Sequence, residues 1–360
     1  MIAGMPSRLR VLAAALLAGC ATAPAPAPGA AAETLVDLFG SHTPDPEVLA
    51  LAGLAPRMTG TQPDPVEVKR RLLATGRFQV VEPFEWHVGQ RRWLFIDLVD
   101  LGAPPPPKMR AAPTGHVDLP SSTVALAHDF EAAFQQEIAG ATRGDEWLDG
   151  RLLRRFAPAR AVEQRLLAQG LAHQAVLEQA VLQDADRDRR EAAALALGYA
   201  GDLAHAATFL IEATRDADSD VRQTASRQLE FLLRQQRCKE PAFVLPAEPF
   251  FEQLRQPHVL ERQKAGALLF ELARSDREVA RRLREEVWPR VQSLERAQLH
   301  VARRVMAYRV GSYRRDPPLT YDEIGALIER DHPEDTGWWK NMTALPGRKQ
   351  SWEQPCAGYR

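Results

Sequence analysis

The stretch DADRDRREAAALAL (residues 184–197) returns 32 residues later, without a gap, as DADSDVRQTASRQL (residues 216–229). Both copies carry three alternating aspartates, then an arginine, an alanine and a leucine at matching places. A self-match at this period is typical of helical repeats, whose units bury their apolar faces only against their neighbours. The doubled stretch therefore predicts an all-α solenoid, an architecture that more often binds other molecules than catalyses reactions.

In each copy the aspartates are expected to form the turn between two short helices, at 172–182 and 189–197 and again at 203–213 and 221–233. Aspartate at a helix start accepts hydrogen bonds from free backbone N–H groups and suits the positive end of the helix dipole. The repeat arginine can pair with an aspartate of its own or of the adjacent turn. The expected ladder consists of Asp184, Arg190, Asp216 and Arg222.

The alternating aspartates also resemble the start of a calcium-binding EF-hand loop. However, Arg189 and Val221 stand where the sixth-position glycine is required, and the twelfth-position glutamate is replaced by Leu195 and Arg227. We therefore predict a structural role for the aspartates and no metal site.

An aspartate-rich turn followed by Val221-Arg222-x-x-Ala225-x-x-x-Leu229 resembles the HEAT repeat. The first copy departs from the pattern at Arg189, where valine is expected. A degenerate third copy begins at Glu261, and a fourth helix pair, at 279–287 and 294–305, is helical by period alone. The resemblance implies a solenoid of HEAT-like repeats that binds proteins.

Residues 34–101 have a different pattern, with the order β-α-α-β-β. Strands are expected at 34–39, 78–81 and 92–100, with Pro83 restricting the end of the second strand. The two helices begin at Pro44 and at Asp64-Pro65, where an N-cap precedes a proline in the first turn. A small three-stranded α+β domain is predicted.

The segments LVDLFG (35–40), PDPEVL (44–49) and LLATGRF (72–78) make this domain similar to the POTRA domains found beside outer-membrane β-barrel proteins. The resemblance implies that an open sheet edge accepts an extended partner strand, with main-chain hydrogen bonds giving affinity. No alternating strand series follows, so the resemblance does not extend to barrel assembly. The alternative is that the neighbouring domain covers the edge.

Residues 102–120 are rich in proline and are expected to form a linker before the helical array at 121–316. Within the array we expect a helix at 124–138, then helices at 152–156 and 161–169, the last ended by Gly170. The tail at 317–360 contains Trp338, Trp339 and Trp352. Either these form a docking surface or the tail caps the last repeat, which we favour.

The N-terminus, residues 1–19, is typical of a signal peptide, with two arginines, a short apolar run and small residues. Its end, Leu17-Ala18-Gly19-Cys20, resembles the lipobox of bacterial lipoproteins. That resemblance implies acylation of Cys20 and, because Ala21 rather than aspartate follows, retention at the outer membrane. Residues 20–33 then form an Ala/Pro tether, too poor in apolar side chains to build a core. An ordinary secretory signal with a chance cysteine is the alternative.

Two cysteines remain if Cys20 carries lipid. Cys238 and Cys356 form an even pair in an oxidising compartment, which allows a disulfide between the tail and the middle of the array. Two free buried thiols are the alternative, because the sequence does not show whether the two residues are close.

The remaining composition argues against several classes of function. A formal net charge of −1, with no strongly basic region, disfavours nucleic acid as a partner. The sequence lacks the close His and Cys pairs of zinc sites, a phosphate-binding loop and a nucleophile elbow. We therefore predict no catalytic, cofactor-binding or metal-binding residues.

Together these features predict a non-enzymatic lipoprotein on the periplasmic face of the outer membrane, which acts as a protein-interaction scaffold in the cell envelope. Its partners would be envelope proteins, bound by β-strand addition or along the concave face of the solenoid. The alternative is a periplasmic enzyme or ligand-binding protein that uses the concave face as a pocket.

Overall fold

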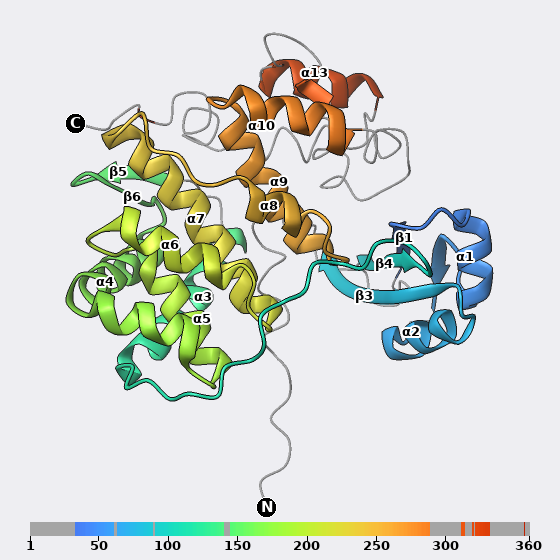
Figure 1. Cartoon of the computed structure of the whole chain (residues 1–360), viewed down its shortest axis with the longest axis horizontal. Coiled ribbons are helices and arrows are strands. Elements are labelled where there is room, and N and C mark those ends of the chain that lie inside the picture. Colours follow the sequence, from blue (N-terminus) through green and yellow to red (C-terminus); the bar gives the residue numbers. More distant parts are fainter. Residues whose placement is uncertain are drawn as a thin grey trace, which may run out of the picture. The chain divides into compact units, whose positions relative to one another are not determined.

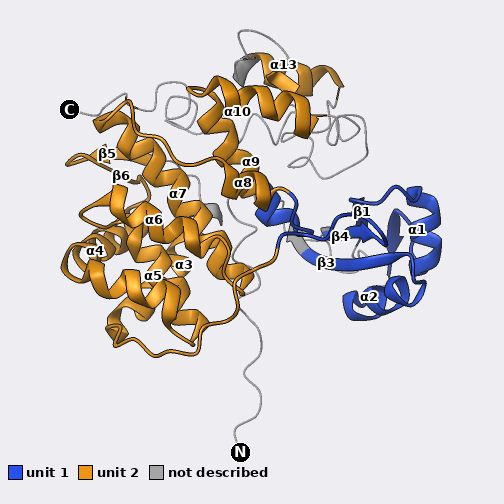
Figure 2. Ribbon diagram, in the orientation of Figure 1, with its two compact units in different colours: residues 1–107, 255–262 blue, residues 108–254, 263–360 orange. Residues whose placement is uncertain are grey.

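A computed structural model of the chain describes residues 33–60, 63–88, 91–139, 145–288, 311–313, 319, 321–331 and 356 (Figure 1). It divides into two compact units (Figure 2). Unit 1 comprises residues 1–107 and 255–262, and unit 2 comprises residues 108–254 and 263–360. The coarse prediction is confirmed: a small α+β region with a mixed sheet is followed by a mostly helical region. Cys20, the tether and the three tail tryptophans lie outside the described residues.

Unit 1 is built on a four-stranded sheet with the order β2-β1-β4-β3. Strands β1 and β4 are parallel, and the other two pairs are antiparallel. Along the chain the elements are β1 (Glu33–Phe39), α1 (Asp45–Ala52), β2 (Arg57–Thr59), α2 (Pro65–Ala74), β3 (Phe78–Val88) and β4 (Arg91–Asp100).

The predicted strands and helices of this region are present, with two corrections. The sheet has four strands rather than three, because the short, mostly exposed β2 pairs with the start of β1. Strand β3 also continues past Pro83, which lies opposite Ile96. Proline is tolerated there because β3 is an edge strand, and its missing N–H removes no bond to β4.

The two faces of the sheet are covered differently. Helices α1 and α2 pack on one face, where Leu72, Leu94 and Ile96 are fully buried. The other face meets residues 255–262, so that the His258 ring lies 5.5 Å from the Phe84 ring. Phe95 on this second face is 0% exposed. Both faces of β4 are therefore buried within unit 1.

Local sequence signals account for the helix ends in unit 1. The Asp64 carboxylate caps α2 by accepting the Val66 N–H at 3.0 Å, as the sequence predicted. Gly40 has φ +97°, and a Cβ there would stand 2.3 Å from the Leu98 carbonyl oxygen. Only glycine therefore fits the turn that leaves β1.

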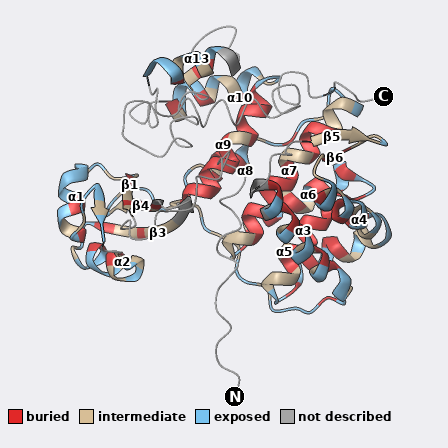
Figure 3. Cartoon of the chain, turned by 180° about the vertical axis from the view of Figure 1, so that it is seen from behind, coloured by how far each residue is buried: buried red, intermediate tan, exposed pale blue. Residues whose placement is uncertain are grey.

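The described elements of unit 2 are mostly helices. They are α3 (Ser121–Ala139), β5 (Asp145–Leu148), β6 (Arg151–Arg154), α4 (Ala157–Gln183), α5 (Arg187–Leu197), α6 (Leu203–Ala213), α7 (Ser219–Lys239), α8 (Glu248–Gln253), α9 (Val259–Ala273), α10 (Arg277–Arg282), a π-helical turn η2 (Leu283–Val287) and α13 (Tyr321–Asp331). The first four residues of α9 belong to unit 1. Buried residues are dense along α5 and α7 (Figure 3).

The helix expected at 152–156 is wrong, because this segment begins with strand β6. Strands β5 and β6 form an antiparallel hairpin around Asp149 and Gly150, which both have positive φ. An Asp-Gly pair in a two-residue loop favours the turn whose twist matches that of antiparallel strands. This local preference overrides the weak helical spacing of the flanking leucines.

The prediction that Gly170 ends a helix is also wrong. Helix α4 runs through this position to Gln183, with one non-helical residue at His173. A Cβ at Gly170 would lie 2.6 Å from the Tyr199 carbonyl oxygen and 3.0 Å from that of Ala196. The glycine therefore permits a close approach between α4 and the end of α5, rather than a helix end.

Within the described residues, no helix combines the length and the apolar composition that a bilayer span requires.

Candidate functional site

The second aspartate of each triplet caps the helix that follows. The Asp186 carboxylate accepts the N–H groups of Asp188 and Arg189 at 2.8 and 3.2 Å. Asp218 does the same for Asp220 and Val221. These bonds satisfy backbone donors that have no partner inside the helix, as the sequence predicted.

The first aspartate of the second copy joins the two turns. Arg190 binds the Asp216 carboxylate with two hydrogen bonds, from Nε at 3.0 Å and from Nη2 at 2.9 Å. Arg190 also donates to the Asp184 carbonyl oxygen at 3.0 Å. Arg190 is 3% exposed and Asp216 is 0% exposed. Burial opposes ionisation of Asp216, but the hydrogen bonds from Arg190 and from the Asp218 N–H keep its pKa below the usual range.

The two copies are not equivalent in their side-chain contacts. The Asp184 carboxylate is bound by Arg189, whose Nε lies 2.9 Å from Oδ2, whereas Arg190 contacts only the backbone carbonyl of Asp184. Arg222 donates to the carbonyl oxygens of Asp216 and Ala217 at 2.7 and 3.0 Å. Arg190–Asp216 is thus a fully buried salt bridge between the turns, beside the more exposed pairing of Arg187 with Asp220 at 3.1 Å. Arg189, which breaks the expected repeat pattern, supplies the partner of the Asp184 carboxylate.

The third copy keeps the backbone contact of its arginine. Arg262 donates from Nη1 to the Gln256 carbonyl oxygen at 2.8 Å, six residues back, as Arg190 and Arg222 do in their own copies. Its Nη2 meets the Asp97 carboxylate of β4 at 2.6 Å, and its guanidinium lies 4.2 Å from the Phe39 ring centroid. Within unit 1, Asp97 therefore takes the place that Asp216 has for Arg190.

The segment at 108–119 lies along the aspartate turns of unit 2. Arg110 donates to the Asp216 carboxylate at 2.8 Å, and the Val117 N–H donates to Asp184 at 3.1 Å. The Ala185 N–H donates to the Gly115 carbonyl oxygen at 2.7 Å. The proline content of this region gave no sign of these contacts, which depend on residues about 70 to 110 positions away.

A second group of charged residues, the buried ionic cluster, consists of Glu137, Asp145, Arg154, Glu163 and Tyr199. The Arg154 guanidinium lies 3.6–3.9 Å from carboxylate oxygens of the three acids. Glu163 accepts the Tyr199 hydroxyl at 2.8 Å and the Arg154 backbone N–H at 2.6 Å. The cluster joins α3, β5, β6, α4 and the end of α5.

The buried ionic cluster contains three acids for one arginine, although Arg234 also lies 3.8 Å from Asp145. Burial raises the pKa of Glu163 to about 7, against the lowering effect of Arg154. Burial likewise raises the pKa of Tyr199. Glu163 is 1% exposed, so it holds a proton more readily in the folded chain than in the unfolded chain.

We expect the free energy of unfolding to increase on acidification from pH 8 to pH 5. The pKa of Glu163 is raised on folding from 4.5 to about 7. The stabilisation that protonated Glu163 contributes is therefore complete below the pKa that Glu163 has in the unfolded chain, and it is lost as the pH rises through 7. The shift in pKa limits this contribution to about 3 kcal/mol. Glu191, whose pKa burial also raises to about 7, acts in the same direction.

Urea unfolding at several pH values tests this expectation. Glu163→Gln should remove about half of the pH dependence, and adding Glu191→Gln should remove most of the rest. Glu146→Gln is the matched control, because Glu146 lies in β5 next to Asp145 of the cluster but its side chain is 33% exposed. A pH dependence that Glu163→Gln leaves unchanged would contradict the assignment.

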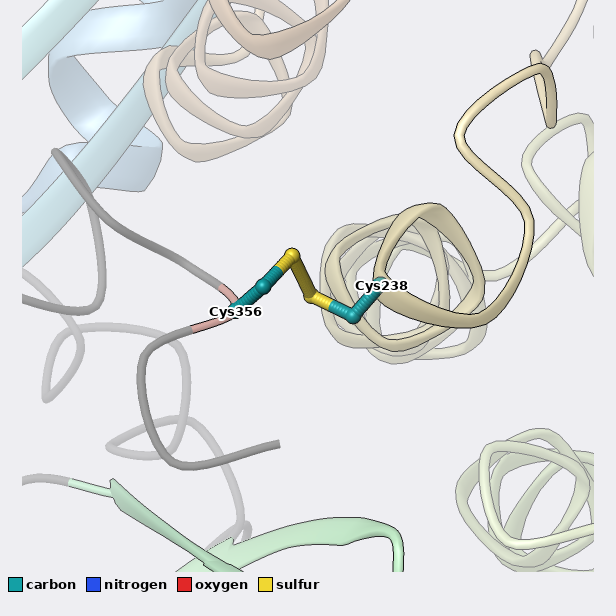
Figure 4. The surroundings of a disulfide bond; sticks show 2 residues. All are labelled: Cys238 and Cys356. Atoms are coloured by element: carbon teal, nitrogen blue, oxygen red, sulfur yellow. A yellow bond between two sulfur atoms is a disulfide. The ribbon is translucent and has the colours of Figure 1, made fainter. Parts of the chain in front are cut away.

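Cys238 and Cys356 form a disulfide with a Cα–Cα distance of 5.2 Å (Figure 4). Cys238 lies in the last turn of α7, and the bond attaches residue 356 to that helix. Of the two alternatives that the sequence left open, the structure contains the bonded one.

Strand β3, whose ladder partner is β4, is the longer of the two edge strands of the unit 1 sheet, and the three-residue β2 is the other. The β3–β4 register has no shift from Val80 to Val88, so every second residue of β3 points its backbone N–H in the same direction. A proline in an edge strand occupies a position whose N–H would point away from the neighbouring strand, as at Pro83. His87 lies four residues after Pro83, so its N–H also points away from β4.

The described acids of unit 2 have partners other than a metal ion. Among the described residues, no three His, Cys, Asp or Glu side chains are arranged to hold a metal ion. The acids of the turns and of the buried ionic cluster instead bind backbone N–H groups, arginines and a tyrosine hydroxyl.

Comparison with protein-family models, with curated proteins and with solved structures finds no match to this chain.

Proposed function

We propose that the protein is a non-enzymatic scaffold of the cell envelope that binds other proteins through its two units. Unit 1 is POTRA-like in this proposal, and the helix pairs of unit 2 are HEAT-like repeats. The observation that carries the proposal is the edge position of β3 in a small mixed sheet. An edge strand presents backbone donors and acceptors to which an extended partner segment can add.

Strand addition is better supported than binding along the inner helices. Residues of α7 such as Gln223, Arg227 and Gln235 are 6% exposed or less, although they are polar. The Gln235 side chain accepts the Leu152 N–H of the β5–β6 hairpin at 3.2 Å. The chain itself therefore occupies this face of α7, which leaves the β3 edge as the candidate surface.

The enzyme alternative would place converging acids in an accessible pocket. The acids of the buried ionic cluster do converge on Arg154, but Glu137 and Glu163 are 2% and 1% exposed and the Asp145 side chain is 10% exposed. This arrangement favours a role in holding the fold together over a role in catalysis.

Replacing His87 with proline tests strand addition. The substitution removes one outward N–H of β3, so the yield of a partner crosslinked to the full-length protein in intact cell envelopes should fall at least about fivefold. His87→Ala is the matched control, because it changes the same side chain and keeps the N–H. If both variants retain the partner equally, binding does not use the β3 edge.

The lipid anchor has a test of its own. In this proposal Cys20 is acylated and holds the protein at the outer membrane, with the folded units in the periplasm. Cys20→Ala should move the protein from the membrane fraction to the soluble fraction, because a short apolar leader alone gives no stable anchor. Cys20→Ala material that still sediments with the outer membrane would contradict lipidation.

A further inference from the structure

The disulfide between Cys238 and Cys356 has two unequal ends. Cys356 is exposed, whereas Cys238 is half-buried in the last turn of α7. One turn earlier on the same side of α7 lie Arg234 and Gln235, which are 7% and 3% exposed. Arg234 pairs with Glu230 at 2.7 Å, and Gln235 holds the β5–β6 hairpin.

This asymmetry decides which sulfur a thiol can reach. Thiol–disulfide exchange requires a thiolate to approach one sulfur along the S–S axis while the other sulfur leaves. Cys238 is half-buried on α7 whereas Cys356 is exposed, so a thiol approaches Cys356 with less obstruction than Cys238. The geometry therefore selects Cys356 as the sulfur attacked and Cys238 as the leaving sulfur.

The charges around Cys238 suit that role. Arg237 and Lys239 flank it in the sequence. The Arg237 guanidinium donates to the Glu271 carbonyl oxygen and the Ser275 hydroxyl, whereas Lys239 is exposed and interacts with the like charge of Arg151. Cations near a sulfur stabilise its thiolate and so favour its departure. The negative end of the α7 dipole acts in the opposite direction, but its effect is that of about half a charge.

We propose that Cys356 is a thiol-exchange site through which a dithiol reductant releases the C-terminal residues from α7. One thiolate of the reductant attacks Cys356 Sγ, a new S–S bond forms, and Cys238 leaves as a thiolate. The second thiolate of the reductant then attacks its own sulfur in the mixed disulfide and frees Cys356. The reductant ends as a disulfide, and two electrons and two protons pass to the cysteines. The proposal is independent of the scaffold function.

Reduction changes the connectivity of unit 2 rather than its helices. The bond closes a loop of 118 residues, so its loss frees residue 356 while the caps and the Arg190–Asp216 bridge remain. The redox state of this bond would thus determine whether residue 356 is held at the end of α7.

Glutathione, a monothiol, tests which sulfur is attacked, because it stops at the mixed disulfide. The full chain is incubated with glutathione without denaturant, and free thiols are alkylated and located by mass spectrometry. We expect glutathione on Cys356 and the alkyl group on Cys238, in at least about tenfold excess over the reverse, with unchanged far-UV circular dichroism. Glutathione on Cys238, or exchange only in denaturant, would overturn the proposal.

Dithiothreitol tests the second step and the leaving group. It should fully reduce the bond in the folded protein, and Lys239→Glu should slow this reduction about threefold to tenfold. Lys239→Gln should slow it less, and Lys108→Glu, which makes the same charge change far along the sequence, should not slow it. Equal rates for Lys239→Glu and Lys108→Glu would overturn the role of Cys238 as the leaving sulfur.

Discussion

Replacing Asp216 with alanine is expected to lower the free energy of unfolding of unit 2 by about 3–5 kcal/mol. The substitution removes the acceptor of both side-chain bonds from Arg190 and of the bond from Arg110. Arg190 remains 3% exposed, with a full charge and only backbone carbonyls as partners. Leaving a buried charge without its counter-ion costs more than the net gain from the original pair.

Urea unfolding of the full chain, resolved by hydrogen exchange of α5 and α7, measures this loss. Asp188→Ala is the matched control, because it removes an aspartate from the first copy of the motif where the side chain is 43% exposed. Asp188→Ala should lower the free energy of unfolding by less than about 0.5 kcal/mol, because the Asp188 carboxylate pairs with the similarly exposed Arg187. Equal losses in the two variants would show that Asp216 acts as a turn residue and not as the centre of the bridge.

The sequence predicted those features of the turns that depend on neighbouring residues. The caps at Asp186 and Asp218 can be predicted because an aspartate at a helix start accepts the free N–H groups two and three residues later. The partners of the first aspartates do not follow from the repeat. Val117 reaches Asp184 across 67 positions, and Arg110 reaches Asp216 across 106. A 32-residue repeat pattern gives no information about contacts between residues that lie so far apart in the sequence.

The same distinction explains the errors in secondary structure. The Asp149-Gly150 turn is a local signal that the sequence did contain, and giving it priority over helical spacing would have predicted the β5–β6 hairpin. Strand β2 is different, because three mostly exposed residues are too few for their alternation to be recognised in the sequence. It forms only because β1 offers an edge on which to pair.

The alternation of side chains along β4 predicts which face of the sheet each residue is on, but not what covers that face. Strict alternation along residues 92–100 puts Leu94 and Ile96 on one face and Phe95 and Asp97 on the other, and Leu94 and Ile96 do pack with α1 and α2. It did not indicate that Asp97 would be 1% exposed, because its partner Arg262 lies 165 positions later. The buried ionic cluster escaped prediction for the same reason, since its members come from five separate segments.

Replacing Arg262 with methionine is expected to lower the free energy of unfolding of unit 1 by about 3–5 kcal/mol. Asp97 would keep its burial and lose the guanidinium that lies 2.6 Å from its carboxylate. Methionine retains an unbranched apolar side chain beside Phe39, so the loss reports the charge more than the volume. Hydrogen exchange of β1 and β4 in the full chain locates the change.

The double variant Asp97→Val with Arg262→Met separates the two explanations of that loss. If the cost comes from a buried carboxylate without a counter-ion, removing the carboxylate as well should recover most of it, because apolar residues of similar size replace buried ion pairs at little cost. If Arg262 instead acts by donating to the Gln256 carbonyl, the double variant should be no more stable than Arg262→Met. In the first case Asp97 and Arg262 act as one ion pair within unit 1, as Asp216 and Arg190 do within unit 2.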